Sequence, residues 1–253
     1  MVRFVIVATE KDLASKNIAN KLIELGKFEK VEEKPYPTLR KGDSLLIWHN
    51  DELTFATDLS QYYEPDCFIC LFRHLSKDNK PCLTVHPTGN LTSEVKRTGN
   101  PYELAIAHPG YMLNILKSLK KYCPEGYSAS YEATHHSPSN LTKPIMFVEI
   151  GSTEKEWNDS KAIEAVAKSV LDLLENPDIE CSPCIGFGGD HYMEKFTKKA
   201  IEENIAFCHM IPSYVFGKIN KDTIQQAMDK TIGAKKAFLD RRSQGKEEER
   251  KLI

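Results

Sequence analysis

Short apolar runs alternate with helix-like stretches along the whole chain, and this alternation is the strongest constraint on its fold. Residues 44–49 and 67–72 form apolar runs, as expected for strands that are covered on both faces. Residues 12–25 instead carry leucines and an isoleucine at helical spacing and stop at Gly26, a residue that commonly ends helices. The pattern predicts an α/β fold with helices on both faces of a mainly parallel or mixed sheet.

The rest of the chain continues the same alternation. Further strands are predicted over 2–8, 83–86, 127–134, 145–150, 184–187 and 205–208. Helices are predicted over 102–121, with a break at 108–110, and over 160–174, 192–203 and 221–233. Because no repeat, linker or shift in composition divides the chain, we expect one catalytic domain over 1–242 and a charged C-terminal tail over 243–253.

Composition excludes several classes of protein. The chain has 253 residues, of which 41% are hydrophobic and 28% are charged, as in ordinary globular proteins. No apolar run approaches the length of a membrane span, so we expect no membrane association and a cytoplasmic location. The net charge of -2 argues against binding nucleic acid through overall charge, and a polyanion would need a local basic patch.

The seven cysteines do not predict a disulfide framework, because their number is odd and they are scattered. Two pairs have C-x-x-C spacing, at 67–70 and 181–184. The first lies in an apolar run and the second in a predicted turn, far outside ordinary zinc-ribbon spacing from each other. We interpret both pairs as structural.

Polar residues follow five of the predicted strands. They are Arg73-His74, the segment 86–90, His135-His136, Glu149 and the segment 188–192. Carboxyl ends of strands are where α/β proteins place their ligand-binding clefts, so these five exits predict one shared cleft.

Two of these strand ends, at His135-His136 and at Glu149, are the most informative about chemistry. Neighbouring side chains in a strand point to opposite faces, so His135 and His136 can meet one ligand only where the strand has ended. Pro138 favours such an end. Glu149 is flanked by Val148 and Ile150, which predicts a buried carboxylate that needs partners. It could act as a general base, a metal ligand or a holder of an imidazole, or form a structural ion pair.

The polar residues at the other strand ends could have purely structural roles. The segment 86–90 could be a turn shaped by Pro87 and Gly89, and 188–192 lacks the fuller motif of a phosphate-binding loop. His191 could bind a metal or cap a helix. Adjacent histidines with scattered glutamates are compatible with zinc, but the chain has no H-E-x-x-H motif.

Taken together and in order, five motifs resemble the archaeal- and plant-type D-aminoacyl-tRNA deacylase family. They are Arg73-His74, LTVHPTGN at 83–90, EATHHSP at 132–138, FVEIGSTEKEW at 147–157 and GGDHY at 188–192. The resemblance runs from Val2 to about Arg242, although Ser137 stands where the family commonly has glycine. It implies a three-layer α/β/α sandwich around a mixed sheet, similar to nucleoside phosphorylases and peptidyl-tRNA hydrolases.

The resemblance also implies an activity. Members hydrolyse the ester between a D-amino acid and the terminal adenosine of tRNA, as a proofreading step of translation quality control. They are described as zinc-containing monomers, and no protein partner is implied. We therefore expect a hydrolase whose substrate is tRNA charged with D-amino acids and whose cofactor is zinc.

Site residues follow as hypotheses. We expect His86, His135, His136 and Glu149 to be catalytic, with either His135 or His136 as general base or metal ligand and Glu149 orienting it. The candidate metal ligands are His135, His136, Glu149 and His191. The candidate substrate-binding residues are Arg73, His74, Thr88, Gly89, Asn90, Gly188, Gly189, His191, Lys235, Lys236 and Arg242.

Within this set, the amides of 88–90 and the loop at Gly188-Gly189 are candidate cradles for an oxyanion or a terminal phosphate. Arg73, Lys235, Lys236 and Arg242 are expected to meet the acceptor-stem backbone. The competing interpretation is a small-molecule enzyme, either nucleoside phosphorylase-like or a metal-dependent amidohydrolase, which would need no basic tail. A non-catalytic RNA-binding module fits poorly, because few aromatic and basic residues are interleaved.

Overall fold

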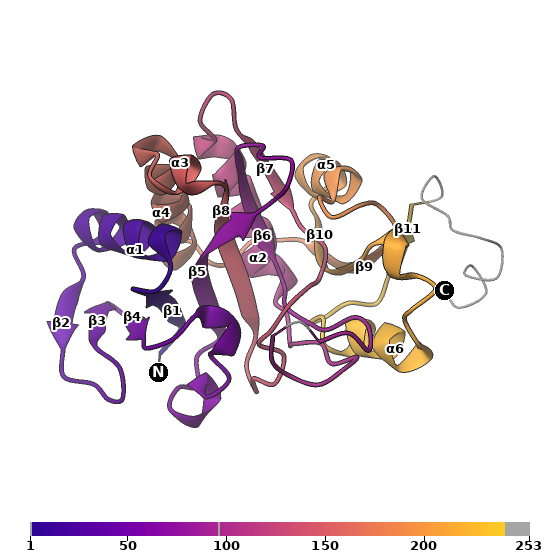
Figure 1. The fold of residues 1–253 in the computed structure, drawn as a ribbon, viewed down its shortest axis with the longest axis horizontal. Helices are drawn as coiled ribbons and strands as arrows, with labels where there is room; N and C mark the ends of the chain where they lie inside the picture. Colours follow the sequence, from indigo (N-terminus) through magenta and orange to yellow (C-terminus); the bar gives the residue numbers. More distant parts are fainter. Residues whose placement is uncertain (1, 96, 241–253) are drawn as a thin grey trace.

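The computed structural model describes residues 2–95 and 97–240, and its centre is an eight-stranded mixed sheet (Figure 1). The strand order is β2-β3-β4-β1-β5-β8-β6-β7. The strands are β1 (Phe4–Thr9), β2 (Glu29–Val31), β3 (Thr38–Lys41), β4 (Ser44–His49), β5 (Cys67–Leu75), β6 (Cys82–His86), β7 (Ser128–Tyr131) and β8 (Ile145–Ser152). The pairs β1–β4, β1–β5, β5–β8 and β6–β7 are parallel, whereas β2–β3, β3–β4 and β6–β8 are antiparallel.

A second sheet of three parallel strands lies beside the first, with order β10-β9-β11. Its strands are β9 (Ser182–Phe187), β10 (Ile205–Ile211) and β11 (Ala237–Leu239). In Figure 1 this small sheet and the helices α5 (Glu194–Glu203) and α6 (Lys221–Asp229) form the orange and yellow part of the molecule.

The two faces of the large sheet are covered differently. One face packs against α1 (Leu13–Gly26), α2 (Pro109–Tyr122) and α4 (Ser160–Glu175), with the short α3 (Glu154–Trp157) at the end of β8. The other face is covered by loops and by the 3-10 helices η1 (Leu53–Phe55) and η2 (Leu59–Gln61). Alternate residues of the central strands fill these two cores, as the strand period requires.

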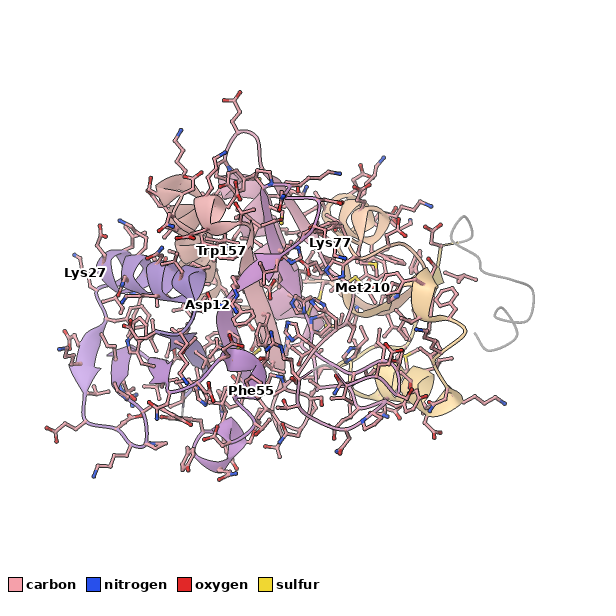
Figure 2. The ribbon with its side chains drawn as sticks, in the orientation of Figure 1. Asp12, Lys27, Phe55, Lys77, Trp157 and Met210 are labelled. Carbon is pink, nitrogen blue, oxygen red and sulfur yellow. The ribbon has the colours of Figure 1, made fainter. Side chains whose placement is uncertain are left out.

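Side chains that bond backbone amides fix where several helices begin. Asp12 accepts the Ser15 N–H at the start of α1, and His108 accepts the Tyr111 N–H at the start of α2. Pro109 then occupies the first turn of α2, where its missing N–H costs nothing. Figure 2 shows Asp12 at the inner end of α1, toward the middle of the molecule, and Lys27 at the outer end.

The expected α/β fold around a mixed sheet is confirmed, with several corrections to its elements. β5 runs on to Leu75, because its register with β8 continues to Leu75–Ser152. His74 and Glu149 therefore lie within paired strands rather than at their exits. The helix predicted from residue 102 begins only at Pro109, and the strand predicted over 127–134 ends at Tyr131.

Among the described residues, no helix is long and apolar enough to cross a membrane. The predicted end of the catalytic domain at residue 242 and the tail over 243–253 lie outside the described residues.

Candidate active site

Five histidines and two glutamates meet where β5, β6, β7 and β8 converge. This imidazole–carboxylate cluster consists of His74, His86, Glu132, His135, His136, Glu149 and His191. His74 lies on β5, His86 ends β6, and Glu149 lies on β8 between them in the sheet. Glu132 directly follows β7, and His191 reaches the cluster from the segment after β9. Five parts of the chain thus supply one site.

Glu132 is fully buried and is shared by three imidazoles. Its Oε1 lies 3.0 Å from His74 Nδ1, and its Oε2 lies 3.0 Å from His191 Nε2. The same Oε2 lies 3.7 Å from His135 Nε2. The carboxylate thus replaces lost hydration with nearby imidazole nitrogens.

Glu149 has an equivalent position on the other side of His74. Its Oε1 lies 3.2 Å from His86 Nε2 and 3.7 Å from His136 Nε2, and its Oε2 lies 3.4 Å from His74 Nδ1. The neighbouring imidazoles outweigh the effect of burial and hold the pKa of Glu149 well below its usual range. The same balance, led by His191 and His74, lowers the pKa of Glu132. Both carboxyl groups are therefore ionised.

His74 connects the two carboxylates. Burial lowers its pKa, but the hydrogen bonds to Glu132 and Glu149 outweigh burial and raise the pKa to about 12. The ring is therefore an imidazolium whose Nδ1–H faces both carboxylates. Its Nε2 lies 2.8 Å from Tyr192 Oη, so the Nε2–H donates to the phenol oxygen. His74 thus supplies a fixed positive charge between two buried negative ones.

Nδ1 is the protonated nitrogen in the rings of His86, His135 and His136. The Nδ1 atoms of His86, His135 and His136 lie 3.1, 2.8 and 2.7 Å from the carbonyl oxygens of Pro87, Ala133 and Ser137, respectively. A carbonyl oxygen only accepts, so each Nδ1 carries a proton. Nε2 is the nitrogen left to bind in His135 and His136, whereas in His86 it faces Glu149 Oε1 at 3.2 Å. The three residues offer ring nitrogens within 4.8 Å of one another.

The pKa values of these three rings are shifted in different directions. Burial, reinforced by His86 and His136, depresses the pKa of His135 well below its usual range. Burial also lowers the pKa of His136, so both rings are neutral at pH 7. Burial lowers the pKa of His86 as well, but its bond to Glu149 outweighs that effect and raises the pKa overall. Two neutral imidazoles therefore stand beside a set of balanced charges.

The donor set fits a divalent metal. Both oxygens of Glu132 and Nε2 of His136 are buried without a hydrogen-bond partner that meets geometric criteria, which is unusual for polar atoms. Imidazole nitrogens with a carboxylate are the ligands that zinc takes in catalytic sites, and an Nδ1–H bonded to a backbone carbonyl is the usual outer support. Three overlapping sets of residues could hold such an ion: His86 with His135 and His136, His74 with Glu132 and His191, and His86 with Glu132 and Glu149.

Two contacts of His209, a buried histidine outside the cluster, position the turn that carries His135. Buried His209 donates its Nε2–H to the Ala105 carbonyl (2.9 Å), and its Nδ1 lies 3.2 Å from Thr134 Oγ1. Burial lowers the pKa of His209 to about 4, so the ring is neutral and Nδ1 accepts the Thr134 hydroxyl. His209 therefore fixes Thr134, the residue that precedes His135 and His136.

The segment 88–90 supports the same turn from the other side. The Gly89 N–H donates to the His136 carbonyl at 2.7 Å, and the Thr88 hydroxyl donates to the Pro138 carbonyl. The Asn90 N–H donates to the Glu103 carbonyl at 2.8 Å. The amides of Gly89 and Asn90 are thus engaged within the protein, so the structure does not support their predicted role as oxyanion donors.

The predicted Gly188-Gly189 cradle is engaged in a similar way. The Gly188 N–H donates to the Ile211 carbonyl at 2.9 Å, and the Gly189 carbonyl accepts from Ser213. Both glycines have positive φ angles, 109° and 77°, which residues with side chains rarely adopt. This turn directs the following residues, including His191, toward Glu132.

Other predicted substrate contacts fall outside the cluster. The Arg73 guanidinium pairs with Asp12 at 3.1 Å and with Glu52 at 3.0 Å, so it is occupied within the protein. The Lys236 carbonyl accepts the Ile185 N–H, which places Lys235 and Lys236 beside the first half of β9, at the opposite end of that strand from His191. Arg242 lies outside the described residues.

A cavity of about 320 Å³ opens directly onto the two catalytic histidine candidates. The residues that line it are Gly89, Asn90, Leu91, Thr92, Glu94, Thr134, His135, His136, Tyr214, Val215 and Lys218. The ion pair between Lys218 and Glu94 joins its two walls at 3.5 Å. The side chain of His135 is 30% exposed, whereas that of His136 is 14% exposed, so His135 is the imidazole more open to a ligand.

Three members of the site have no role in the sequence-based hypotheses. Glu132 lies in the EATHHSP motif, but a glutamate after a short strand gives no signal that it is buried. Tyr192, the partner of His74, likewise belongs to the GGDHY motif. Tyr214, on the wall of the cavity, lies in a segment with no motif.

Comparison with known proteins agrees with the motifs. The family model described as D-aminoacyl-tRNA deacylase matches residues 61–253. A protein of that name from Methanocaldococcus jannaschii is 37% identical over 252 residues, covering 94% of this chain and 90% of that protein. The chain belongs to the D-aminoacyl-tRNA deacylase family.

Two further relatives extend this assignment. A D-aminoacyl-tRNA deacylase from Methanocorpusculum labreanum is 37% identical and covers 96% of this chain, which spans only 54% of that longer protein. A crystal structure of a conserved protein of unknown function superimposes with a TM-score of 0.92 at 28% identity, covering 99% of this chain and 90% of that one. The superposition shows that the two proteins share one fold over almost the whole chain.

Proposed function

We propose that this chain hydrolyses the ester between a D-amino acid and the 3′-terminal adenosine of tRNA, releasing the tRNA and the free D-amino acid. Membership of the deacylase family supports the reaction and the substrate class. The observation that carries the proposal is an imidazole, His135, that lines a cavity and lies beside the buried carboxylate of Glu132. Because charged tRNA is used in translation, the proposal places the enzyme in the cytoplasm.

The chemistry needs a base, a charge for the oxyanion and a proton donor for the leaving ribose. His135 can serve as the base, since its Nδ1–H is held by the Ala133 carbonyl and its Nε2 has a free lone pair. It takes a proton from the attacking water and returns it to the ribose oxygen when the carbon–oxygen bond breaks. Glu132, 3.7 Å from that Nε2, stabilises the imidazolium that forms between these two steps.

We propose zinc as the cofactor, held by His86, His135 or His136 together with Glu149. When bound there, zinc supplies positive charge for the tetrahedral oxyanion and acidity for the attacking water. If His135 is a ligand, the base is another group of the cluster, and replacement of each histidine in turn decides between the two roles. His74 keeps the remaining charge of the carboxylates balanced in either case.

Selection of the D-isomer is assigned to the cavity beside His135. Leu91, Tyr214 and Val215 give it an apolar wall, and a wall that clashes with the side chain of an L-residue rejects it by shape. The small volume of about 320 Å³ suits an aminoacyl group rather than a whole nucleotide.

The decisive experiment compares hydrolysis of D-tyrosyl-tRNA and L-tyrosyl-tRNA by the wild-type chain and by His136→Ala and Glu149→Gln. We expect turnover of the D-ester only, and losses of at least about 100-fold in both variants. His108→Asn is the matched control, because this histidine caps α2 outside the cluster and asparagine also caps helices. Near-normal turnover by both cluster variants would contradict the proposal.

A further inference from the structure

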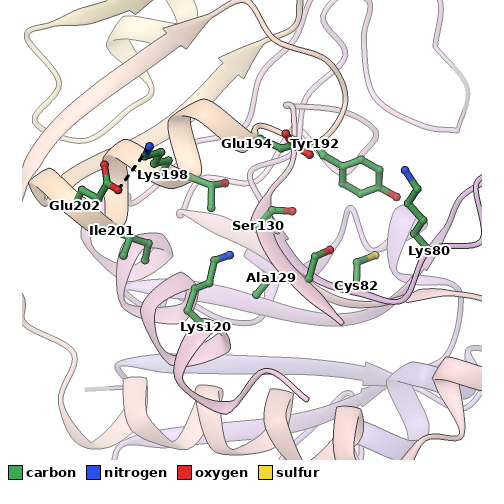
Figure 3. Close-up of a pocket in the computed structure, with 12 residues that line it drawn as sticks. Lys80, Cys82, Lys120, Ala129, Ser130, Tyr192, Glu194, Lys198, Ile201 and Glu202 are labelled. Carbon is green, nitrogen blue, oxygen red and sulfur yellow. Dashed lines mark ion pairs between the residues drawn. The ribbon is translucent and has the colours of Figure 1, made fainter. Parts of the chain in front are cut away.

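A second cavity, of about 520 Å³, is lined by Tyr192 (Figure 3), the residue whose hydroxyl oxygen lies 2.8 Å from His74 Nε2. It is bordered by the edge strand β7, by α5 and by the C-terminal end of α2. Ser128 and Ser130 present hydroxyl groups to it, and Ala129 and Ile201 supply apolar surface. No member of the imidazole–carboxylate cluster lines it, so it is distinct from the cavity at His135.

This cavity lies next to a third cavity, of about 720 Å³, with which it shares the lining residues Tyr192 and Glu194. His191 and Lys77 also line the third cavity. Because His191 lies 3.0 Å from Glu132 and Tyr192 contacts His74, both cavities border residues that touch the cluster.

Two lysines without an ion-pair partner line the cavity behind Tyr192. Lys80 and Lys120 stand on two sides of it in Figure 3, and neither has a carboxylate within ion-pair distance among the residues that the structure describes. Lys198, on the same rim, lies 3.9 Å from Glu202 and is partly neutralised. Because Glu194 also lies on the rim, three lysines face two glutamates there, whereas more carboxylates than lysines line the third cavity.

Two other lysines near the site are paired. Lys195, which borders the third cavity, binds Asp240 at 2.6 Å, and Lys218 binds Glu94 at 3.5 Å. The lysines predicted to meet RNA, Lys235 and Lys236, lie at the opposite end of β9. Among the described residues, the lysines that line these two cavities without an ion-pair partner are Lys77, Lys80 and Lys120.

We propose that this cavity binds the single-stranded 3′ end of tRNA, next to the terminal adenosine whose ester is cut. Lys80 and Lys120 contact phosphate groups, while Ser128 and Ser130 meet ribose or base edges and Ile201 packs against a base. Lysine ammonium groups, hydroxyls and a modest apolar surface suit a phosphodiester with an unstacked base. This inference rests on the proposed function, because it requires the ester at the cluster.

The test is a double variant, Lys80→Gln with Lys120→Gln, assayed on D-tyrosyl-tRNA and on 3′-D-tyrosyl-adenosine, which lacks the preceding nucleotides. We expect the ratio of kcat/KM for the tRNA to kcat/KM for the adenosine ester to fall roughly tenfold. A plot of log kcat/KM for tRNA against log salt should become shallower by about 1.4, since each lost contact with a single strand removes about 0.7.

The matched control is Lys30→Gln with Lys34→Gln. Lys30 lies on β2, at the opposite edge of the large sheet from β7, and both residues are exposed. We expect the ratio and the salt slope of this control to equal those of the wild type. Melting temperatures of both double variants verify that they are folded.

The outcomes separate the two proposals. If wild-type protein cuts D-tyrosyl-tRNA and the Lys80/Lys120 variant keeps the wild-type ratio and slope, the RNA site is wrong and the proposed function stands. An equal loss on both substrates also overturns the RNA site, because the effect then passes through Tyr192 to His74. If the wild-type protein cuts neither ester, the proposed function itself fails.

Discussion

The ion pair between Glu132 and His74 is the contact on which the geometry of the site most depends, and its strength can be measured. Their atoms are 3.0 Å apart, and the side chains are 0% and 4% exposed. At an effective dielectric constant of about 20, two unit charges at that distance attract by roughly 5 kcal/mol. Desolvation offsets about half of this, so we expect a coupling energy of about 2–3 kcal/mol.

A double-mutant cycle isolates this term. Glu132→Gln and His74→Gln should each lower the free energy of unfolding by about 3–5 kcal/mol, because each leaves a buried charge with fewer partners. The double variant should lose about 2–3 kcal/mol less than the sum of the two. Urea denaturation followed by the fluorescence of Trp48 and Trp157 gives these values, with a chelator in every sample to keep metal binding constant.

Two results would refute this reasoning. Losses that add to within about 0.5 kcal/mol would show that the pair is not coupled. A single variant with wild-type stability would show that the buried charge is not held as the structure indicates. Reduced turnover without a change in stability would instead make Glu132 purely catalytic.

Three further predictions concern pH, packing and metal. Burial raises the pKa of Asp12 from 3.8 to about 6, so the native state binds a proton that the unfolded state releases. The unfolding free energy of wild type relative to Asp12→Asn should therefore fall by roughly 2 kcal/mol between pH 4 and 6.5, measured by urea denaturation. Gly151→Ala should cost about 1–3 kcal/mol and lower turnover, because its Cβ would lie 2.7 Å from the His74 ring, and paired denaturation and hydrolysis assays test this. Zinc at about 1,000 times its Kd should stabilise the wild type by about 4 kcal/mol in calorimetry and stabilise His136→Ala much less.

The sheet could be predicted from sequence where strands are apolar on both faces. β1, β4, β5 and β8 are such strands, and their apolar runs are visible without any structure. β2 and β3 were not predicted, because both strands are short and contain mainly polar residues. Their assignment depends on pairing at the edge of the sheet, which a sequence pattern does not contain.

The segment before α2 shows a different limit. Residues 102–108 have a helix-like composition, yet long-range backbone bonds hold them outside any helix. The Ala105 N–H donates to the Thr88 carbonyl, and the Ala107 N–H donates to the Lys230 carbonyl. Local periodicity describes the preference of the segment alone, and tertiary contacts override it here.

The sequence also predicted that these residues meet in one site. For Glu149, however, the structural reason differs from the one used in the prediction. The rule that polar residues after apolar runs share one edge of the sheet led to His86, His135, His136, Glu149 and His191, and the structure places all five in one cluster. Their individual catalytic, metal-binding and substrate-binding roles remain predictions. Glu149 lies inside a paired strand, so what brings it to the site is the register of β8 with its neighbours.

The part that could not be predicted is the way the charges are balanced. A glutamate in sequence carries no mark of its burial, and the stability of Glu132 depends on one ring from its own segment and two from distant segments. Two buried carboxylates without those rings would each cost several kcal/mol, which a sheet of apolar side chains would avoid. A chain that retains such a costly arrangement, next to an open cavity, must gain something from it other than stability. The gain we infer is a pair of neutral imidazoles, His135 and His136, kept ready to bind and to exchange protons at pH 7.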